Sequence, residues 1–354
     1  MKYLIKLTPL KPFFFGGDTT FGKLGDKDKD KDKDKDKDKD KDKDKDKDKG
    51  TYLVKSRLFP QQTAILGMIR KEMLIQKGFL TTKINYGEWV DEKDKKNAKY
   101  FIGDTKFEFN TKQDFGVLKN ISPIFLLRGD KKFIKKVDID SFKFILDKNK
   151  QPLLENYNPK EDIYDNFISI DNSKTFKTKD IFRAIEEIGI KKITKATAEE
   201  NEKKNNSYFK KTSYTLKHNF KFAFFIESDF ELEDAFITLG GEKSTFKMEV
   251  TQNNNSLEYK DKNGYLILLS DAYLDIDIKE NCDFAITSEI SFNYLQNKFQ
   301  DNKIKFEKAK QTLFLYEKGS IFINPKGKLI DNLNNQNLQK IGLNNYSYKK
   351  GATK

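Results

Sequence analysis

Alternating apolar side chains in both halves of the chain constrain its fold most. Residues 2–8, 220–226 and 246–250 each alternate, as Phe222 and Phe224 do in the second run. A period of two is typical of strands with one buried face. Short apolar runs that predict further strands occur at 52–54, 121–127, 142–146, 265–269, 312–316 and 321–323. Because helical segments are few and do not alternate regularly with strands, the pattern predicts an α+β fold rather than a doubly wound sheet.

A charged repeat interrupts the first half of the chain. Residues 26–49 are twelve consecutive Asp-Lys pairs without an apolar side chain, so this segment is expected to be disordered. It lies between the predicted strands at 2–8 and 52–54, where a long insertion costs little loop entropy. We interpret it as a tolerated low-complexity insertion, with an electrostatic tether as the alternative.

The clearest helical pattern lies in residues 61–76. Ile65, Ile69 and Met73 recur at four-residue spacing, which is typical of a helix with one buried side. Pro60 immediately precedes the run, so the helix N-terminus is expected beside it. The amides of a helix N-terminus favour an anion such as a phosphate.

A second helix is predicted at 178–188. Thr178 is a candidate N-cap, the apolar residues follow a helical stripe, and Gly189 would end the helix. The polar segment 196–207 is predicted to be a mobile loop.

Charge indicates a polyanionic partner. The 354 residues include 68 Lys and Arg against 55 Asp and Glu, and the Asp-Lys pairs contribute equally to both, so the formal charge of +13 belongs to the remainder. The alternative is a Lys-rich solvated surface. A single cysteine, Cys282, excludes an internal disulfide and fits a reducing compartment. The N-terminus does not resemble a signal peptide and no apolar run reaches membrane-spanning length, so we expect a cytoplasmic protein without a membrane partner.

Few residues have the pattern of a catalytic or metal site. His218 is the only histidine and precedes an alternating strand, where a structural role is the simpler interpretation. Asp275 and Asp277 are expected on one face of a strand and could hold a metal, although solvated carboxylates are the simpler interpretation. Nucleotide-binding glycine motifs are absent. We therefore expect no catalytic residue, no metal and no cofactor.

Two glycine-containing loops are better candidates for binding. Gly16 and Gly17 follow three phenylalanines and would let a ligand backbone approach closely, while the phenylalanines could stack on bases or be buried at a turn. Gly240 and Gly241 precede Lys243 and two hydroxyl side chains, which is typical of a phosphate-binding loop or of a plain hairpin turn.

Several segments together resemble one family. They are LTPLKPFFFGGDTTFG (7–22), SRLFPQQTAILGMIR (56–70), EIGI (187–190) with YFKKTSY (208–214), LGGEKSTF (239–246), and more weakly LYEKGSIFI (315–323) and IGLNNYSY (341–348). In this order they are similar to the third subunit of the Cmr complex, a type III-B CRISPR RNA-guided effector of the repeat-associated mysterious protein (RAMP) superfamily.

The resemblance implies ferredoxin-like RAMP modules, similar to RNA-recognition motifs, with glycine-rich loops and insertions. We assign residues 1–175 to an N-terminal module that contains the Asp-Lys insertion and 176–354 to a strand-rich C-terminal module. The residues expected to contact RNA are Gly16, Gly17, Lys55, Ser56, Arg57, Gln61, Gln62, Arg70, Gly240, Gly241, Lys243, Ser244, Gly342 and Asn344.

The resemblance implies a non-catalytic function in antiviral defence. The subunit would hold the 5′ handle of the CRISPR RNA and dock the large polymerase-like Cmr subunit. It would also contact the RAMP backbone subunits and meet target RNA indirectly. The alternative is a RAMP endoribonuclease that processes precursor CRISPR RNA with His218, or a nearby Tyr or Lys, as general acid and base.

Overall fold

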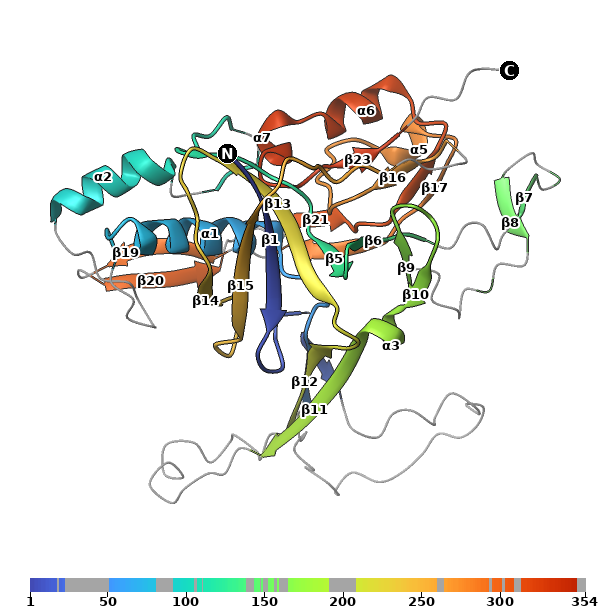
Figure 1. Cartoon of the computed structure of the whole chain (residues 1–354). Coiled ribbons are helices and arrows are strands. Elements are labelled where there is room, and N and C mark those ends of the chain that lie inside the picture. Colours follow the sequence, from blue (N-terminus) through green and yellow to red (C-terminus); the bar gives the residue numbers. More distant parts are fainter. Residues whose placement is uncertain are drawn as a thin grey trace, which may run out of the picture.

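A nine-stranded sheet runs through the middle of the molecule (Figure 1). Its order is β10 (Thr175–Lys177), β9 (Asn166–Ser169), β6 (Lys131–Lys135), β5 (Phe125–Arg128), β13 (Lys221–Ser228), β1 (Lys2–Pro9), β15 (Thr245–Gln252) and β14 (Ala235–Thr238), with β4 (Leu118–Ile121) also paired to β13. The computed structural model describes residues 1–17, 19–22, 51–80, 92–104, 107–109, 111–137, 143–146, 148, 152–155, 158, 165–190, 208–259, 264–292, 295–300, 303–308 and 313–348.

The centre of this sheet has the ferredoxin-like strand order. β13 lies between β1 and the pair β4 and β5, and β1 lies between β13 and β15, with every neighbouring pair antiparallel. Helix α1 (Gln62–Gln76) connects β1 to β4 and β5 in the chain, as the first helix of a β-α-β-β-α-β unit does. The connection from β13 to β15 carries β14 where that unit has its second helix. The predicted α+β class is confirmed.

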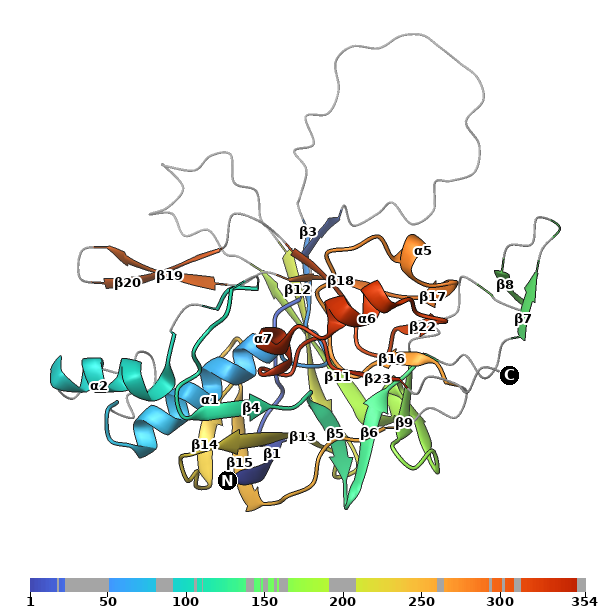
Figure 2. The ribbon, with the colours of Figure 1, turned by 90° about the horizontal axis from the view of Figure 1, so that it is seen from above.

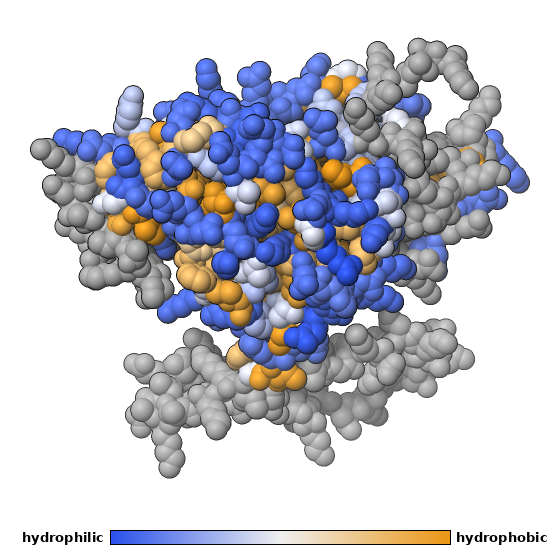
Figure 3. Space-filling view, in the orientation of Figure 1, coloured by the Kyte–Doolittle hydropathy of each residue, from blue (hydrophilic) through white to orange (hydrophobic). Residues whose placement is uncertain are grey.

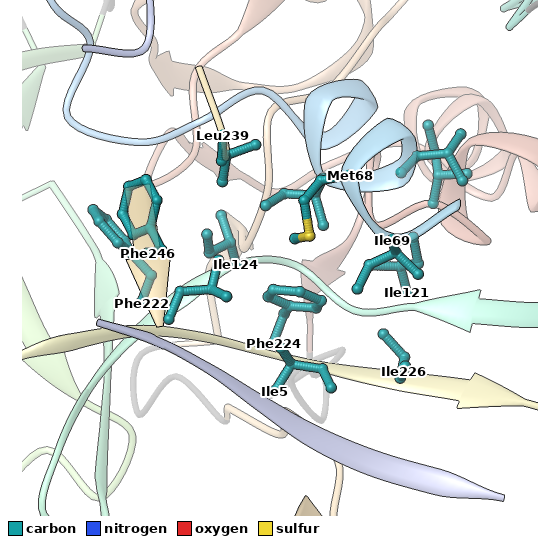
Figure 4. Close-up of a cluster of buried hydrophobic side chains, with 14 of the residues drawn as sticks. Ile5, Met68, Ile69, Ile121, Ile124, Phe222, Phe224, Ile226, Leu239 and Phe246 are labelled. Carbon is teal, nitrogen blue, oxygen red and sulfur yellow. The ribbon is translucent and has the colours of Figure 1, made fainter. Parts of the chain in front are cut away.

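One core lies between α1 and the sheet. Ile5, Phe222 and Phe246 come from three neighbouring strands and each has 0% of its surface exposed. Figure 4 shows these side chains directed toward Met68 and Ile69 of α1. The alternation seen in the sequence therefore buries one face of the sheet against the helix. Complete burial of one such side chain stabilises the fold by about 1.5–3 kcal/mol.

A second sheet covers part of the opposite face. It is ordered β17 (Phe284–Ile286), β22 (Ile321–Ile323), β16 (Leu266–Leu268) and β23 (Tyr346–Ser347). Leu4 and Phe225 of the large sheet pack with Ile267 and Ile321 of this sheet in a second core. α6 (Gly327–Leu333) packs on this second sheet through Leu329 and Leu333, whereas Figure 2 shows α7 (Gln336–Gln339) next to α1, whose core includes Leu338. α5 (Ile278–Asn281) precedes β17.

The remaining elements are short. α2 (Glu92–Ile102) packs beside α1 through Ala98 and Ile102. Three hairpin-like pairs are β7 (Lys143–Leu146) with β8 (Pro152–Glu155), β18 (Glu289–Phe292) with β21 (Leu313–Tyr316), and β19 (Leu295–Gln300) with β20 (Lys303–Lys308).

A four-stranded sheet, here called the arm, projects from the end of the large sheet (Figure 1). It is ordered β11 (Phe182–Ile190), β12 (Tyr208–Leu216), β3 (Thr51–Lys55) and β2 (Thr19–Gly22). β3 runs parallel to β12, while the outer pairs are antiparallel. Figure 3 shows apolar as well as polar atoms on this narrow part of the surface.

The helix predicted at 178–188 is wrong in most of its length. Only one turn, α3 (Thr178–Ile181), is helical, its N-cap is Lys177 rather than Thr178, and β11 follows without a break. The stripe of the sequence ends on Ile188, whose surface is 74% exposed, so it meets no core there. Pairing of all nine residues of β11 with β12 replaces the local helical preference.

Other predicted elements differ in detail. The expected strand at 121–127 is divided into β4 and β5, because the segment around Pro123 leaves the pairing. The residues from 273 to 277 form no strand, and Asp277 instead caps α5 by accepting the amide of Lys279 at 2.9 Å. His218 lies in the turn between β12 and β13 with a left-handed φ of 52°.

The boundary expected between residues 175 and 176 passes through the nine-stranded sheet. β1 precedes it and pairs with β13 and β15, which follow it. The ferredoxin-like unit therefore takes strands from both sides, because strand pairing joins segments far apart in sequence. The Asp-Lys tract at 26–49 and the loop predicted at 196–207 lie outside the described residues.

Candidate nucleic-acid interface

The loop of Phe13 to Gly17 is fastened to the base of the arm. The amide of Phe13 donates to the carbonyl of Tyr214 at 2.8 Å, and the amide of Phe15 donates to Oγ of Ser56 at 2.9 Å. Phe13 is fully buried and its ring stacks on that of Phe15, with centroids 4.7 Å apart. These two rings therefore belong to the core, so of the two alternatives for the phenylalanines the structure shows burial at a turn for Phe13 and Phe15.

Gly17 allows this loop to touch strand β3. A Cβ atom at Gly17 would lie 1.7 Å from the carbonyl oxygen of Lys55, so no other residue fits the observed backbone. The amide of Arg57 donates to the carbonyl of Gly16 at 2.7 Å. Gly16 itself has a φ of 72° and open space around it. The two glycines therefore have different roles, close approach at Gly17 and backbone conformation at Gly16.

The second glycine loop joins the first. The amide of Gly241 donates to the carbonyl of Phe14 at 2.8 Å, and Oγ of Ser244 accepts the amide of Phe14 at 3.0 Å. Gly240 has a φ of 87°, and a Cβ there would lie 2.5 Å from the same carbonyl oxygen. Three segments that are distant in sequence thus meet at the base of the arm.

A groove of about 610 Å³ lies on one face of the arm. Its lining residues are Gly17, Leu53, Val54, Lys55, Ser56, Arg57, Ala184, Glu186, Lys210, Thr212 and Tyr214. The cross-strand register explains this set, because Lys210, Thr212 and Tyr214 alternate along β12 and Glu186 faces Thr212 from β11. Lys55 is exposed, and Lys210 pairs with Glu186 at 2.9 Å. Three cations and one carboxylate leave the groove basic.

The opposite face of the arm is organised by ion pairs. Lys211 lies 3.0 Å from Glu187 and 3.7 Å from Glu242, and its Nζ lies 5.9 Å from the centroid of the Phe14 ring. On the same face the ring of Phe209 covers Gly189, where a Cβ would lie 2.0 Å from the ring. The face is therefore closer to charge neutrality than the groove.

Six of the residues expected to contact RNA are buried in the chain. They are Ser56, Gln62, Arg70, Ser244, Gly342 and Asn344. Nε2 of Gln62 donates to the carbonyls of Ser122 and Ile341, both at 2.9 Å, and Nδ2 of Asn344 donates to the carbonyl of Tyr273 at 3.0 Å. These side chains stabilise the junction between α1 and the C-terminal segment.

The side chain of Arg70 is buried and is not placed to contact a ligand. Its guanidinium lies 5.4 Å from the centroid of the Phe115 ring, and only 8% of the residue is exposed. Burial lowers the pKa of Arg70 to about 10, while Asp104 and Asp114 oppose this shift. The structure thus gives Arg70 a place in the packing of α1, which corrects its expected role in binding RNA.

The candidates that are exposed or half-buried divide into two groups. Exposed Lys55 and half-buried Arg57 and Gly17 belong to the groove, whereas Gly240, Gly241 and Lys243 are exposed on the neighbouring loop. Gln61 is half-buried at the start of α1. Sequence reasoning missed Lys210, Thr212 and Tyr214, although their alternation in YFKKTSY could have predicted a strand with one polar face.

Of the residue types named for the alternative, nuclease function, the groove contains Tyr214, Lys55 and Lys210 but not His218. Neither a histidine nor a cysteine occurs among its described lining residues. His218 is exposed in its turn and is not part of this lining. Within the described ranges, no group of three or more His, Cys, Asp or Glu residues is placed to hold a metal ion. The helices described by the structure include none that is long and apolar enough to cross a membrane.

Comparison with known proteins gives matches in structure only. No family model and no curated protein matches the sequence. Two solved structures of type III-B Cmr-beta bound to cognate target RNA, one of them also with AMPPnP, are similar to this chain with a TM-score of 0.49 and 16% identity, over 98% of this chain and 96% of theirs. A Csm3-Csm4 subcomplex of the type III-A CRISPR-Cas interference complex is similar with a TM-score of 0.35 and 13% identity, over 92% of this chain and 94% of the other.

Proposed function

We propose that this chain is a non-catalytic, guide-RNA-binding subunit of a type III-B CRISPR effector complex. The groove on the arm would hold the 5′ handle of the CRISPR RNA. The observation that supports this most is the meeting of Gly17, Lys55, Arg57 and Lys210 around one basic groove. These residues lie in separate segments that resemble the third Cmr subunit, and the fold brings them together.

The groove suits a single-stranded RNA backbone. Lysine and arginine side chains neutralise phosphates, and a glycine on the wall lets the backbone of the ligand approach the protein. Thr212 and Tyr214 add a hydroxyl and an aromatic ring on the same face, which suits contact with a ribose or a splayed base. Such contacts position the RNA, while sequence discrimination depends on base edges.

Salt dependence tests this proposal. The double variant Lys55→Ala, Lys210→Ala should bind handle RNA about tenfold more weakly at about 0.15 M salt, with a logarithmic salt slope shallower by about 1.4. Fluorescence anisotropy across a salt series measures both. The control is Lys119→Ala, Lys131→Ala, which removes the same charge at exposed ion pairs with Asp229 and Asp171, away from the groove. If both variants lose the same RNA affinity, the loss comes from the change in net charge, and the assignment of RNA binding to the groove is contradicted.

A separate experiment tests the absence of catalysis. The purified chain is incubated with labelled repeat RNA without metal, and we expect no cleavage. Cleavage that is lost in a folded His218→Ala variant would favour the endoribonuclease.

Docking belongs to the same proposal. The large polymerase-like subunit and the RAMP backbone subunits are the proposed protein partners, and target RNA is met indirectly through the complex. Co-purification from the native host with mass spectrometry should recover these proteins with CRISPR RNA. Recovery of the chain alone, with no RNA, would contradict complex membership.

A further inference from the structure

Lys318 is a buried residue whose amine forms no ion pair with any residue that the structure describes. It lies in the turn between β21 and β22, and only 7% of its surface is exposed. Its amide donates to Oδ1 of Asp271 at 3.0 Å, but among the described residues no carboxylate lies within ion-pair distance of its Nζ. The adjacent Glu317 pairs instead with Lys135 at 2.6 Å. Because buried lysines are normally paired, this arrangement is unusual for a purely structural residue.

The amine of Lys318 lies against the lead-in to α1. Its Nζ is 4.1 Å from the centroid of the Phe59 ring, two residues before Gln61, the N-cap of the helix. Burial lowers the pKa of the Lys318 amine, and the carboxylates of Asp271 and Glu317 oppose this shift. Cation–π contact with Phe59 compensates part of the lost hydration but supplies no counter-charge.

The start of α1 also lacks a partner. Gln61 makes no side-chain cap, the first turn contains no acidic residue, and the amides of Gln62 and Thr63 have no acceptor among the described residues. α1 has 15 residues, so its N-terminus carries appreciable partial positive charge. The uncapped helix start follows a lead-in whose Phe59 ring contacts the Lys318 amine, and both positive groups favour an anion.

Two sets of contacts hold Lys318 and the start of α1 in one neighbourhood. Gln62 donates to the carbonyl of Ile341, and the amide of Asn344 donates to the carbonyl of Asp271 at 3.1 Å. Asp271 in turn accepts the amide of Lys318. The C-terminal loop from 341 to 344 therefore supports both the helix start and the turn that carries the lysine.

Arg57 continues this region into the groove. Its Nη2 donates to the carbonyl of Ser291, while its Nη1 is buried and has no hydrogen-bond partner in the structure. Arg57 also lines the groove on the arm. Arg57 precedes Gln62, the first residue of α1, by five positions, so the end of the groove and the helix start are close in the chain.

We infer that Lys318, Arg57 and the first amides of α1 bind one phosphate group of an RNA chain. The phosphate supplies the negative charge that Lys318 lacks and the acceptors that the helix amides lack. This inference rests on the proposed function for the identity of the ligand as RNA. It adds a binding residue from the C-terminal part of the chain, which the sequence analysis did not predict.

The main test compares Lys318→Met with Lys132→Met. Methionine keeps most of the apolar stem and removes the charge. Lys132 is a matched control because its Nζ also lies over a phenylalanine ring, 4.8 Å from the centroid of Phe225, and burial also lowers its pKa. The probe is a labelled eight-nucleotide single-stranded RNA with the handle sequence. We expect Lys318→Met to bind it about fivefold more weakly, with a salt slope shallower by about 0.7, and Lys132→Met to bind within twofold of wild type.

Thermal unfolding distinguishes binding from a structural role. Without RNA, Lys318→Met should have a Tm equal to or above that of wild type, because a buried unpaired charge is removed. Equal RNA binding by wild type and Lys318→Met, or equal losses in both variants, would overturn the inference. A lower Tm without RNA would assign Lys318 to stability instead.

A measurement on the wild-type chain covers the case in which Lys318→Met does not fold. Pyrophosphate is titrated into isotope-labelled wild-type protein, and the NMR signals of the Gln62 and Thr63 amides should shift. If they do not shift, the anion site is wrong. If they shift but the wild-type chain does not bind RNA, the anion site stands and the proposed function fails.

Discussion

The nine-stranded sheet and the arm are both built from strands with alternating side chains, but the arm buries them only near its base, where Phe182 and Tyr214 join the core of the sheet. Phe222, Phe224 and Phe246 of the sheet are each fully buried. On the arm, Ile188 is 74% exposed and Phe209 is 42% exposed, while Lys210 and Lys211 form ion pairs with glutamates of β11. The sheet is therefore stabilised by packing, whereas backbone pairing maintains the arm and leaves a face accessible to a partner.

The contrast predicts a large difference in stability between two truncations. Phe222→Ala should lower the free energy of unfolding by about 3–5 kcal/mol, because it leaves a cavity in the core. Ile188→Ala should change it by less than about 0.5 kcal/mol, since the side chain is exposed. Urea unfolding followed by circular dichroism measures both. An equal loss of stability in the two variants would mean that the Ile188 side chain is packed against another surface.

The two glycines of the first loop sharpen the comparison at the point where sheet and arm meet. Gly17→Ala should lower the free energy of unfolding by about 1–3 kcal/mol and weaken RNA binding, because its Cβ would collide with the carbonyl of Lys55. Gly16→Ala meets no neighbour and should cost about 1 kcal/mol through its left-handed backbone alone. Unfolding and RNA affinity are measured for each. Weaker RNA binding by Gly16→Ala than by Gly17→Ala would contradict the assignment of Gly17 to the groove wall.

Removing the carboxylate from the groove should affect binding more than folding. Glu186→Gln should strengthen RNA binding about twofold to fivefold, because it frees Lys210 and removes a charge that repels phosphate. The free energy of unfolding should change by less than about 0.5 kcal/mol, as expected for an exposed ion pair. Glu187→Gln on the opposite face is the matched control for both measurements. A gain of affinity in the control alone would place the RNA on that face.

The smallest effect is expected for an ion pair on the sheet. The hydrogen bond from Lys221 lowers the pKa of the Glu249 carboxyl below its ordinary value of 4.5, against an opposing effect of burial. Its contribution to stability is therefore present above pH 4.5 and is lost as the pH falls through the lowered pKa. Glu249→Gln should lower the free energy of unfolding by less than about 1 kcal/mol at neutral pH, with the difference from wild type disappearing in acid. A difference that grows toward low pH would contradict this sign.

The sequence by itself determined the central strands of the sheet, β1, β13 and β15, and the position of α1, but it did not predict β6, β9 or β10. The apolar residues of the strands repeat with a period of two, and those of α1 with a period of about four. Each repeat places the apolar side chains on one face of its own element, and that face is buried when the elements pack. The sequence also marked the glycine loops and the basic lead-in to α1. Its failure at 178–188 shows the limit, since Ile181, Phe182, Ile185 and Ile188 follow a helical stripe that only pairing with β12 overrides.

Only the tertiary structure decided which of the marked residues face a ligand. Gln62, Arg70, Ser244 and Asn344 have polar side chains suited to RNA, yet they are buried and satisfy contacts within the chain or pack on its rings. Lys210 and Lys318 received no special role from the sequence, because one lysine among 68 basic residues has no local signal. Their significance comes from register and burial, which depend on strands paired across most of the chain, and such non-local contacts leave no periodic pattern in sequence.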